Sequence, residues 1–129
     1  MINYKDLMPY QKAHICNGCG PKWSIVKAPS FVFIENCNRH DFGYWLGAPF
    51  GFRRIKRLEE DIQFLLGNLK DVEKQPKEMW SVYYKAAYRY FQMVRLFGWT
   101  AFNWGPMKTQ EDLDRLTGDE NGMDNKILE

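Results

Sequence analysis

Apolar residues recur at helical spacing over two long stretches of this chain. Between residues 52 and 72 they lie three or four positions apart and predict one long helix: Ile55, Leu58, Ile62, Leu65, Leu66 and Leu69. Pro76 and Gly98 bound a second predicted helix, because proline favours the first turn of a helix and glycine follows its end. This helix holds aromatic side chains that we expect in the core: Trp80, Tyr83, Tyr84, Tyr88 and Phe91. The pattern predicts a mainly α-helical protein.

A third helix is predicted with Asn36 as its N-cap and Gly47 as its stop. The spacing i, i+3, i+4, i+7 along it, which marks one helix face, is occupied by reactive or ionisable side chains: Cys37, His40, Asp41 and Tyr44. An ionised carboxylate or an imidazole is costly to bury without a partner. This face therefore needs a second polar group, a metal ion or water, and it is the strongest candidate for a functional site.

The length and composition indicate one domain with a modest, aromatic-rich core. A length of 129 residues allows one modest core and is too short for two well-buried ones, while 45% of the residues are hydrophobic and 16% aromatic. We expect residues 1–105 to form the domain and residues 106–129 to be a partly disordered C-terminal extension. The net charge of +2 is too small to indicate nucleic-acid binding.

The first ten residues include Lys5 and Asp6 and contain no continuous apolar run, so we expect no signal peptide here. No apolar stretch approaches the roughly 20 residues needed to span a bilayer. The sequence therefore predicts a soluble protein without a transmembrane segment. It leaves the compartment open between the cytoplasm and leaderless export.

The polar helix face carries a motif, Cys37-x-x-His40-Asp41-x-x-Tyr44, that resembles the signature of the phospholipase A2 superfamily. The likeness is closer to the bacterial, fungal and phage-type branch than to the disulfide-rich venom and pancreatic branch. Two further stretches are similar to that branch: Asp61-x-x-Phe64 on the partner helix and residues 90–98 in the closing helix.

This resemblance implies a phospholipase A2-like fold, in which two long packed helices carry a His/Asp site beside a calcium loop and a third, aromatic-rich helix. It implies that His40 is the general base, that Asp61 orients it, and that Tyr44 is hydrogen-bonded to Asp61. The implied activity is calcium-dependent hydrolysis of a glycerophospholipid acyl ester by water that His40 activates, without a covalent intermediate. The implied partner is phospholipid at a membrane or micelle surface.

The implied cofactor is calcium, bound by a glycine-rich loop. Asp41 points about 100° away from His40 on a helix, so its carboxylate can face that loop. By position relative to the cysteines, the carbonyl ligands of the family fall on Gly18, Gly20 and Lys22. Carbonyl oxygens with one carboxylate suit calcium, which prefers oxygen ligands. The loop-to-helix disulfide of the family maps onto Cys19 and Cys37.

Two other interpretations use the same residues or their neighbours. A structural zinc site would take every cysteine in the chain and one histidine, at four-ligand spacing: Cys16, Cys19, Cys37 and His40. A non-catalytic lipid- or partner-binding module on the same fold is the other, because the basic run 53–57 lies near Trp45, Phe50 and Phe52. We expect that basic run to be a solvated helix face. The zinc site leaves the acids at 41 and 61 unexplained, so hydrolysis is the favoured prediction.

Overall fold

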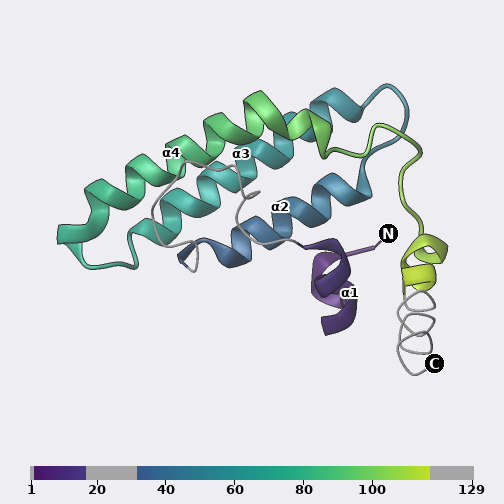
Figure 1. Ribbon diagram of the computed structural model, residues 1–129, viewed down its shortest axis with the longest axis horizontal. Coiled ribbons are helices and arrows are strands. Elements are labelled where there is room, and N and C mark those ends of the chain that lie inside the picture. The colour runs from purple at the N-terminus through teal and green to yellow at the C-terminus, as the bar shows by residue number, and fades with distance from the viewer. Residues whose placement is uncertain (1, 17–31, 117–129) are drawn as a thin grey trace, which may run out of the picture.

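Three long helices lie side by side along the longest axis of the molecule (Figure 1). This computed structural model describes residues 2–16 and 32–116. The α-helices are α1 (Pro9–Ile15), α2 (Ile34–Leu46), α3 (Arg53–Val72) and α4 (Trp80–Phe97), and residues 110–116 are also helical. Short 3-10 turns cover Tyr4–Asp6, Lys77–Met79 and Gly98–Thr100. The described part of the chain contains no strand, so the predicted mainly helical class is confirmed.

The predicted stop of α2 at Gly47 is confirmed, but its predicted start is wrong. Gly47 adopts φ +71°, which glycine tolerates best, and a Cβ there would lie 2.8 Å from the amide nitrogen of Asn103. The helix begins two residues before Asn36. Instead of capping α2, the Asn36 amide donates to Asn68 Oδ1 (3.0 Å) and Asp71 Oδ2 (2.8 Å) on α3. This residue therefore joins two helices rather than starting one.

The predicted end of α4 at Gly98 is also confirmed. Pro76 precedes a 3-10 turn rather than the α-helix itself, which begins at Trp80. A Cβ at Gly98 would lie 2.7 Å from the hydroxyl oxygen of Tyr44 on α2. The absence of a side chain at this position lets the end of α4 approach the polar residues of α2.

Two apolar clusters hold the helices together. The first joins α2, α3 and α4 and contains Phe33, Cys37, Phe64, Val72, Tyr83, Ala86, Ala87 and Tyr90. The second packs the N-terminal segment against the other side of α2 and contains Tyr4, Leu7, Ile15, Phe42, Leu46 and Leu113. Leu113 lies beyond the predicted domain boundary at residue 105, yet it is a buried member of the second cluster. Residues 117–129 lie outside the described residues.

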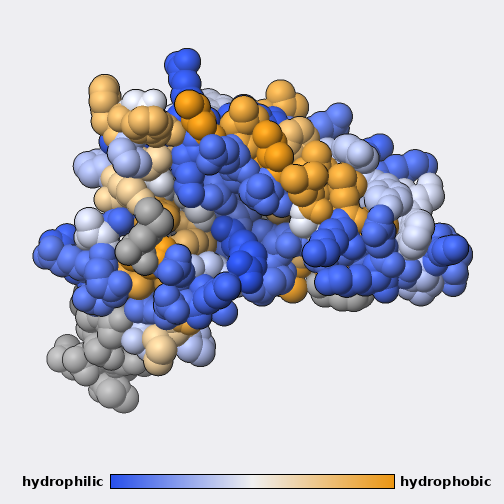
Figure 2. Space-filling model, turned by 180° about the vertical axis from the view of Figure 1, so that it is seen from behind, coloured by the Kyte–Doolittle hydropathy of each residue, from blue (hydrophilic) through white to orange (hydrophobic). Residues whose placement is uncertain are grey.

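The buried face of α3 is not the apolar stripe that predicts the helix. The side chains that α3 buries are Arg57, Asp61, Phe64, Asn68 and Val72. Four members of the apolar stripe are exposed: Ile55 (56%), Leu58 (42%), Ile62 (38%) and Leu66 (53%). A hydrophobic band crosses the face of the molecule shown in Figure 2, bordered by hydrophilic residues. The helical period locates α3 correctly, but it does not identify the side that packs on the core.

Within the described residues, the helices are all too short or too polar to cross a membrane.

Candidate active site

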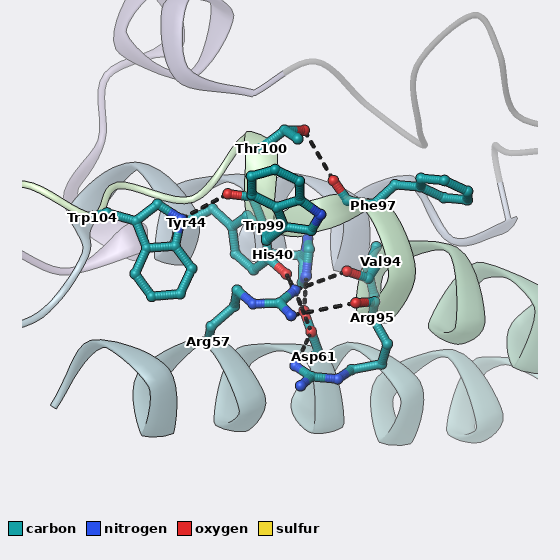
Figure 3. Close-up of polar contacts among 10 residues, drawn as sticks. All are labelled: His40, Tyr44, Arg57, Asp61, Val94, Arg95, Phe97, Trp99, Thr100 and Trp104. Atoms are coloured by element: carbon teal, nitrogen blue, oxygen red, sulfur yellow. Dashed lines mark hydrogen bonds and ion pairs between the residues drawn. The ribbon is translucent and has the colours of Figure 1, made fainter.

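His40 on α2 and Asp61 on α3 form a buried pair between the two helices. The distance from His40 Nε2 to Asp61 Oδ1 is 2.7 Å, and the two residues are 6% and 0% exposed. Figure 3 shows the imidazole of His40 directed at the carboxylate of Asp61. The structure therefore brings together the two residues that the sequence places 21 positions apart.

Asp61 is the centre of a network of four donors. Tyr44 donates to Oδ1 (2.5 Å), while Arg95 and Arg57 donate to Oδ2 (2.7 and 3.4 Å). Burial alone would raise the pKa of Asp61, but the hydrogen bonds from His40, Tyr44 and Arg95 outweigh it and hold that pKa below its ordinary value. Asp61 is therefore an ionised carboxylate at neutral pH although water does not reach it.

An ionised carboxylate only accepts hydrogen bonds, which fixes the tautomer of a neutral His40. The ring must carry its proton on Nε2 to donate to Asp61, and Nδ1 then presents a lone pair. The ring is also held by neighbours on both helices, because its centroid lies 4.1 Å from that of Tyr44 and 4.8 Å from that of Phe64. His40 is thus an oriented base with one nitrogen committed to Asp61.

Tyr44 is the second donor from α2. Burial, followed by the hydrogen bond to Asp61 and the charge of that carboxylate, raises the pKa of the Tyr44 phenol above its ordinary value. The phenol therefore keeps its proton and acts as a donor. Its ring also packs edge-on against Phe102, at 5.1 Å between centroids.

Arg57 and Arg95 are functional candidates that the sequence analysis missed. Arg57 belongs to the basic run expected to be a solvated face, and that prediction is wrong for this residue, which is 8% exposed. Its guanidinium donates to Tyr44 Oη (3.1 Å) and to the carbonyl oxygens of Val94 (2.9 Å) and Arg95 (3.3 Å). The signal in the sequence was the i, i+4 spacing between Arg57 and Asp61, which places both on one face of a helix.

The C-terminal end of α2 is capped by residues that no motif predicts. The Asn103 backbone N–H donates to Tyr44 O (3.0 Å), and its side-chain amide donates to Trp45 O (3.2 Å). The Lys108 N–H donates to Leu46 O (2.9 Å). These bonds satisfy the last carbonyl groups of the helix that carries His40 and Tyr44, which would otherwise lack partners. They fix the end of α2 closest to the network.

A groove of about 410 Å³ opens between α2 and α3 beside His40. Its lining combines apolar, cationic, acidic and amide side chains, among them His40, Phe64, Leu66, Arg39, Lys70, Glu60 and Gln63. The groove reaches the imidazole, and its walls combine apolar surface with two cationic side chains and the Glu60 carboxylate.

The predicted calcium loop lies outside the described residues, and so do Gly18, Gly20 and Lys22. Asp41 is half-buried on α2. It lies close enough to Cys16 that, after burial itself, its charge is the main cause raising the pKa of that thiol to about 11. Asp41 is therefore near the point where the chain enters the predicted loop. No group of three or more metal-binding side chains occurs among residues 2–16 and 32–116.

Two of the three cysteines of the alternative zinc site are described in the structure. Cys37 is disulfide-bonded, while Cys16 is a free thiol that donates to Asn38 O at 3.2 Å. The expected disulfide partner, Cys19, is not among the described residues. Zinc binds cysteine as a free thiolate. The zinc interpretation would therefore require the disulfide of Cys37 to be reduced, and it stays a prediction.

Comparisons with protein-family models, curated proteins and solved structures gave no match for this chain. Any functional conclusion therefore depends on the residues and geometry described above.

Proposed function

We propose that this protein is a phospholipase A2-like hydrolase that cleaves an acyl ester of a glycerophospholipid with water activated by His40. The observation that supports it best is the 2.7 Å contact between His40 Nε2 and the buried, ionised Asp61. A neutral imidazole held in this way is a base for a substrate outside the pair, because its other nitrogen is committed to the carboxylate.

In the proposed reaction, His40 Nδ1 takes a proton from water as the water oxygen bonds to the ester carbonyl carbon. Asp61 stabilises the imidazolium that forms. The bond between the carbonyl carbon and the glycerol oxygen then breaks, and the imidazolium returns the proton to that oxygen. The products are a free fatty acid and a lysophospholipid. Neither a serine nor a cysteine nucleophile takes part.

Arg57, Arg95 and Tyr44 keep Asp61 ionised during this cycle. Each donates to the carboxylate, at distances between 2.5 and 3.4 Å. Because the proton on His40 Nε2 faces an acid with a lowered pKa, it stays on the imidazole. The proton that moves during the reaction is the one on Nδ1.

The groove beside His40 suits a substrate that is part hydrocarbon and part anion. Phe64 and Leu66 offer apolar surface, and Arg39 and Lys70 offer positive charge at the same groove. Glu60 also lines the groove, but its carboxylate is paired with Lys56 at 2.8 Å. A glycerophospholipid carries an acyl chain and a phosphate close to the scissile ester. The donor set therefore favours this substrate class over a neutral or purely polar ester.

Calcium is the cofactor that this proposal implies. Asp41 and the carbonyl oxygens of Gly18, Gly20 and Lys22 would hold it, a set of hard oxygen donors that suits this ion. The position of Asp41 near Cys16 agrees with such a site, because the proposed carbonyl ligands follow that cysteine in the chain. When bound, calcium polarises an ester carbonyl and stabilises negative charge on its oxygen.

Measuring fatty-acid release from phospholipid vesicles with calcium and with excess chelator tests this proposal. We expect release with calcium and about 100-fold less with chelator. Asp41→Asn should raise the calcium concentration that gives half-maximal rate by about tenfold. Asp61→Asn should lower the maximal rate by about 100-fold while leaving that concentration unchanged.

Three results would count against the proposal. Release that persists unchanged in chelator would exclude the calcium requirement. An equal rise in the calcium concentration at half-maximal rate for both variants would exclude separate roles for Asp41 and Asp61. Vesicle binding without any release would instead favour the non-catalytic lipid-binding module.

A further inference from the structure

The outer face of α3 combines two features that are unfavourable for a helix exposed to water. Four aliphatic side chains on it are between 38% and 56% exposed: Ile55, Leu58, Ile62 and Leu66. They follow one another at intervals of three or four residues, so they form a single ridge along the helix. We refer to these four residues as the α3 ridge. Isolated apolar residues on a surface are common, but a contiguous row marks a surface that contacts something apolar.

The N-terminal end of the same helix carries positive charge where helices favour negative charge. Arg53 and Arg54 occupy the first turn of α3, and no acidic residue lies in that turn. The N–H groups at this end already carry partial positive charge. The two arginines are therefore repelled by the helix end as well as by each other. An anionic partner would relieve that repulsion.

Exposed aromatic residues stand directly before these arginines. Phe50 is 86% exposed and Phe52 is 61% exposed. The Arg53 guanidinium lies over the Phe50 ring, 5.5 Å from its centroid. Aromatic side chains next to arginine are the residues that settle at the boundary between lipid headgroups and acyl chains.

The α3 ridge also reaches the groove that contains His40. Leu66 belongs to the ridge and lines the groove, together with Lys70. A surface that touched the ridge would therefore lie beside the opening to His40. Glu59 is also exposed on α3, while Lys56 and Glu60 pair with each other at 2.8 Å. Within the described residues, Arg53 and Arg54 at one end of α3 and Lys70 near its other end have no acidic partner within ion-pair distance, and the two adjacent arginines make the Phe50–Arg54 end the more positive one.

We propose that the α3 ridge, with Phe50, Phe52, Arg53 and Arg54, docks the protein on a lipid surface that carries negative headgroups. The apolar row enters the headgroup boundary and the arginines contact the anionic phosphates. This extends the proposed function, because it would hold the His40 groove against its substrate, but docking does not require turnover.

Vesicle sedimentation with the full-length His40→Ala protein in chelator tests docking without hydrolysis or calcium bridging. The probes are vesicles of phosphatidylcholine alone and vesicles of equal parts phosphatidylcholine and phosphatidylglycerol. We expect binding to the mixed vesicles that is at least tenfold tighter than to the neutral ones. Arg53→Gln with Arg54→Gln should reduce that difference to about twofold or less, since each basic residue contributes about fivefold near an anionic surface.

A second pair of variants tests the apolar part. Ile55→Ser with Ile62→Ser should weaken binding to mixed vesicles about tenfold or more. The matched controls lie on α4: Val82→Ser, whose side chain is 49% exposed, and Lys85→Gln with Arg89→Gln. These controls should bind within twofold of the parent, and circular dichroism should show every variant folded.

Three outcomes would overturn the docking proposal. The first is that the His40→Ala protein does not bind mixed vesicles. The second is that the ridge variants bind as tightly as the His40→Ala protein. The third is that the protein forms a stable dimer, which the Ile55→Ser and Ile62→Ser substitutions dissociate. The last result would assign the ridge to a second copy of the chain. Every binding experiment uses the His40→Ala protein, so a failure to bind vesicles does not contradict the hydrolysis proposal. Likewise, a lack of hydrolysis by the unmodified protein does not contradict the docking proposal.

Discussion

The two faces of α3 depart in opposite ways from the usual distribution of polar and apolar residues. The face that packs on α2 and α4 carries Arg57, Asp61 and Asn68, all 8% exposed or less. The face that meets solvent carries the α3 ridge. A helix selected for stability alone would turn the aliphatic row inward, because burying it is favourable and burying charge is not.

This reversal indicates where function constrains the sequence. The buried charges are tolerated because each has partners, with four donors on the Asp61 carboxylate. The exposed row is tolerated because other residues supply the core: Phe64 and Val72 on the buried face of α3, Phe33 before α2, and the aromatic residues of α4. Two departures from a stable pattern on one helix are explained together if one face performs chemistry and the other contacts lipid.

The largest effect should come from comparing two residues of α3 that are only two positions apart. Phe64→Ala should lower the free energy of unfolding by about 3–5 kcal/mol, because Phe64 is buried against His40 and Tyr90. Leu66→Ala should change it by less than about 0.5 kcal/mol, since Leu66 is exposed. Urea denaturation measures both. An equally large loss in Leu66→Ala would mean that the ridge is packed in solution.

A somewhat smaller effect is expected from the two arginines of the basic run. Arg57→Met should cost about 2–3 kcal/mol, because it removes hydrogen bonds to a carboxylate, a phenol and two carbonyl groups inside the protein. Arg54→Met, at an exposed position of the same helix, should fall within about 0.5 kcal/mol of the parent. Thermal and urea unfolding of the two variants provide the comparison. Similar losses in both would contradict the separation of the faces.

The smallest effect concerns the dependence of stability on pH. The pKa of Asp61 is lower in the folded protein than its ordinary value of 3.8, so its ionised form contributes stability above that value. This contribution is lost as the pH falls below about 4 and the carboxylate takes up a proton. Asp61→Asn cannot titrate, so the urea midpoint of this variant should fall less steeply between about pH 5 and pH 2. Parallel curves for variant and parent would show that Asp61 is not held ionised.

The sequence predicts the helices and the polar face of α2 because both depend on local spacing. Four side chains at i, i+3, i+4 and i+7 share a helix face whatever surrounds them. Gly47 ends the helix because glycine readily adopts the positive φ found there. The pairing of His40 with Asp61 followed from the resemblance, since nothing local connects residues 21 positions apart.

The orientation of α3 could not be predicted in the same way. Periodicity shows that apolar residues share a face, but the choice of buried face depends on which neighbours supply partners for Arg57 and Asp61. Those partners come from α2 and from the end of α4, at Tyr44, Val94 and Arg95. For the same reason, local spacing alone places Arg57 on a solvated face. The caps that Asn103 supplies to α2 have no signal in the sequence.

We propose that the buried polar face of α3 and the histidine it holds perform ester hydrolysis. The most direct test is fatty-acid release from a short-chain phosphatidylcholine, dispersed as monomers with calcium, by His40→Ala and by His14→Ala. The second variant removes the other histidine of the chain, which is exposed on α1. We predict that His40→Ala lowers the rate by about 100-fold or more, whereas His14→Ala stays within twofold of the parent. Equal rates for the parent protein and His40→Ala would contradict the account.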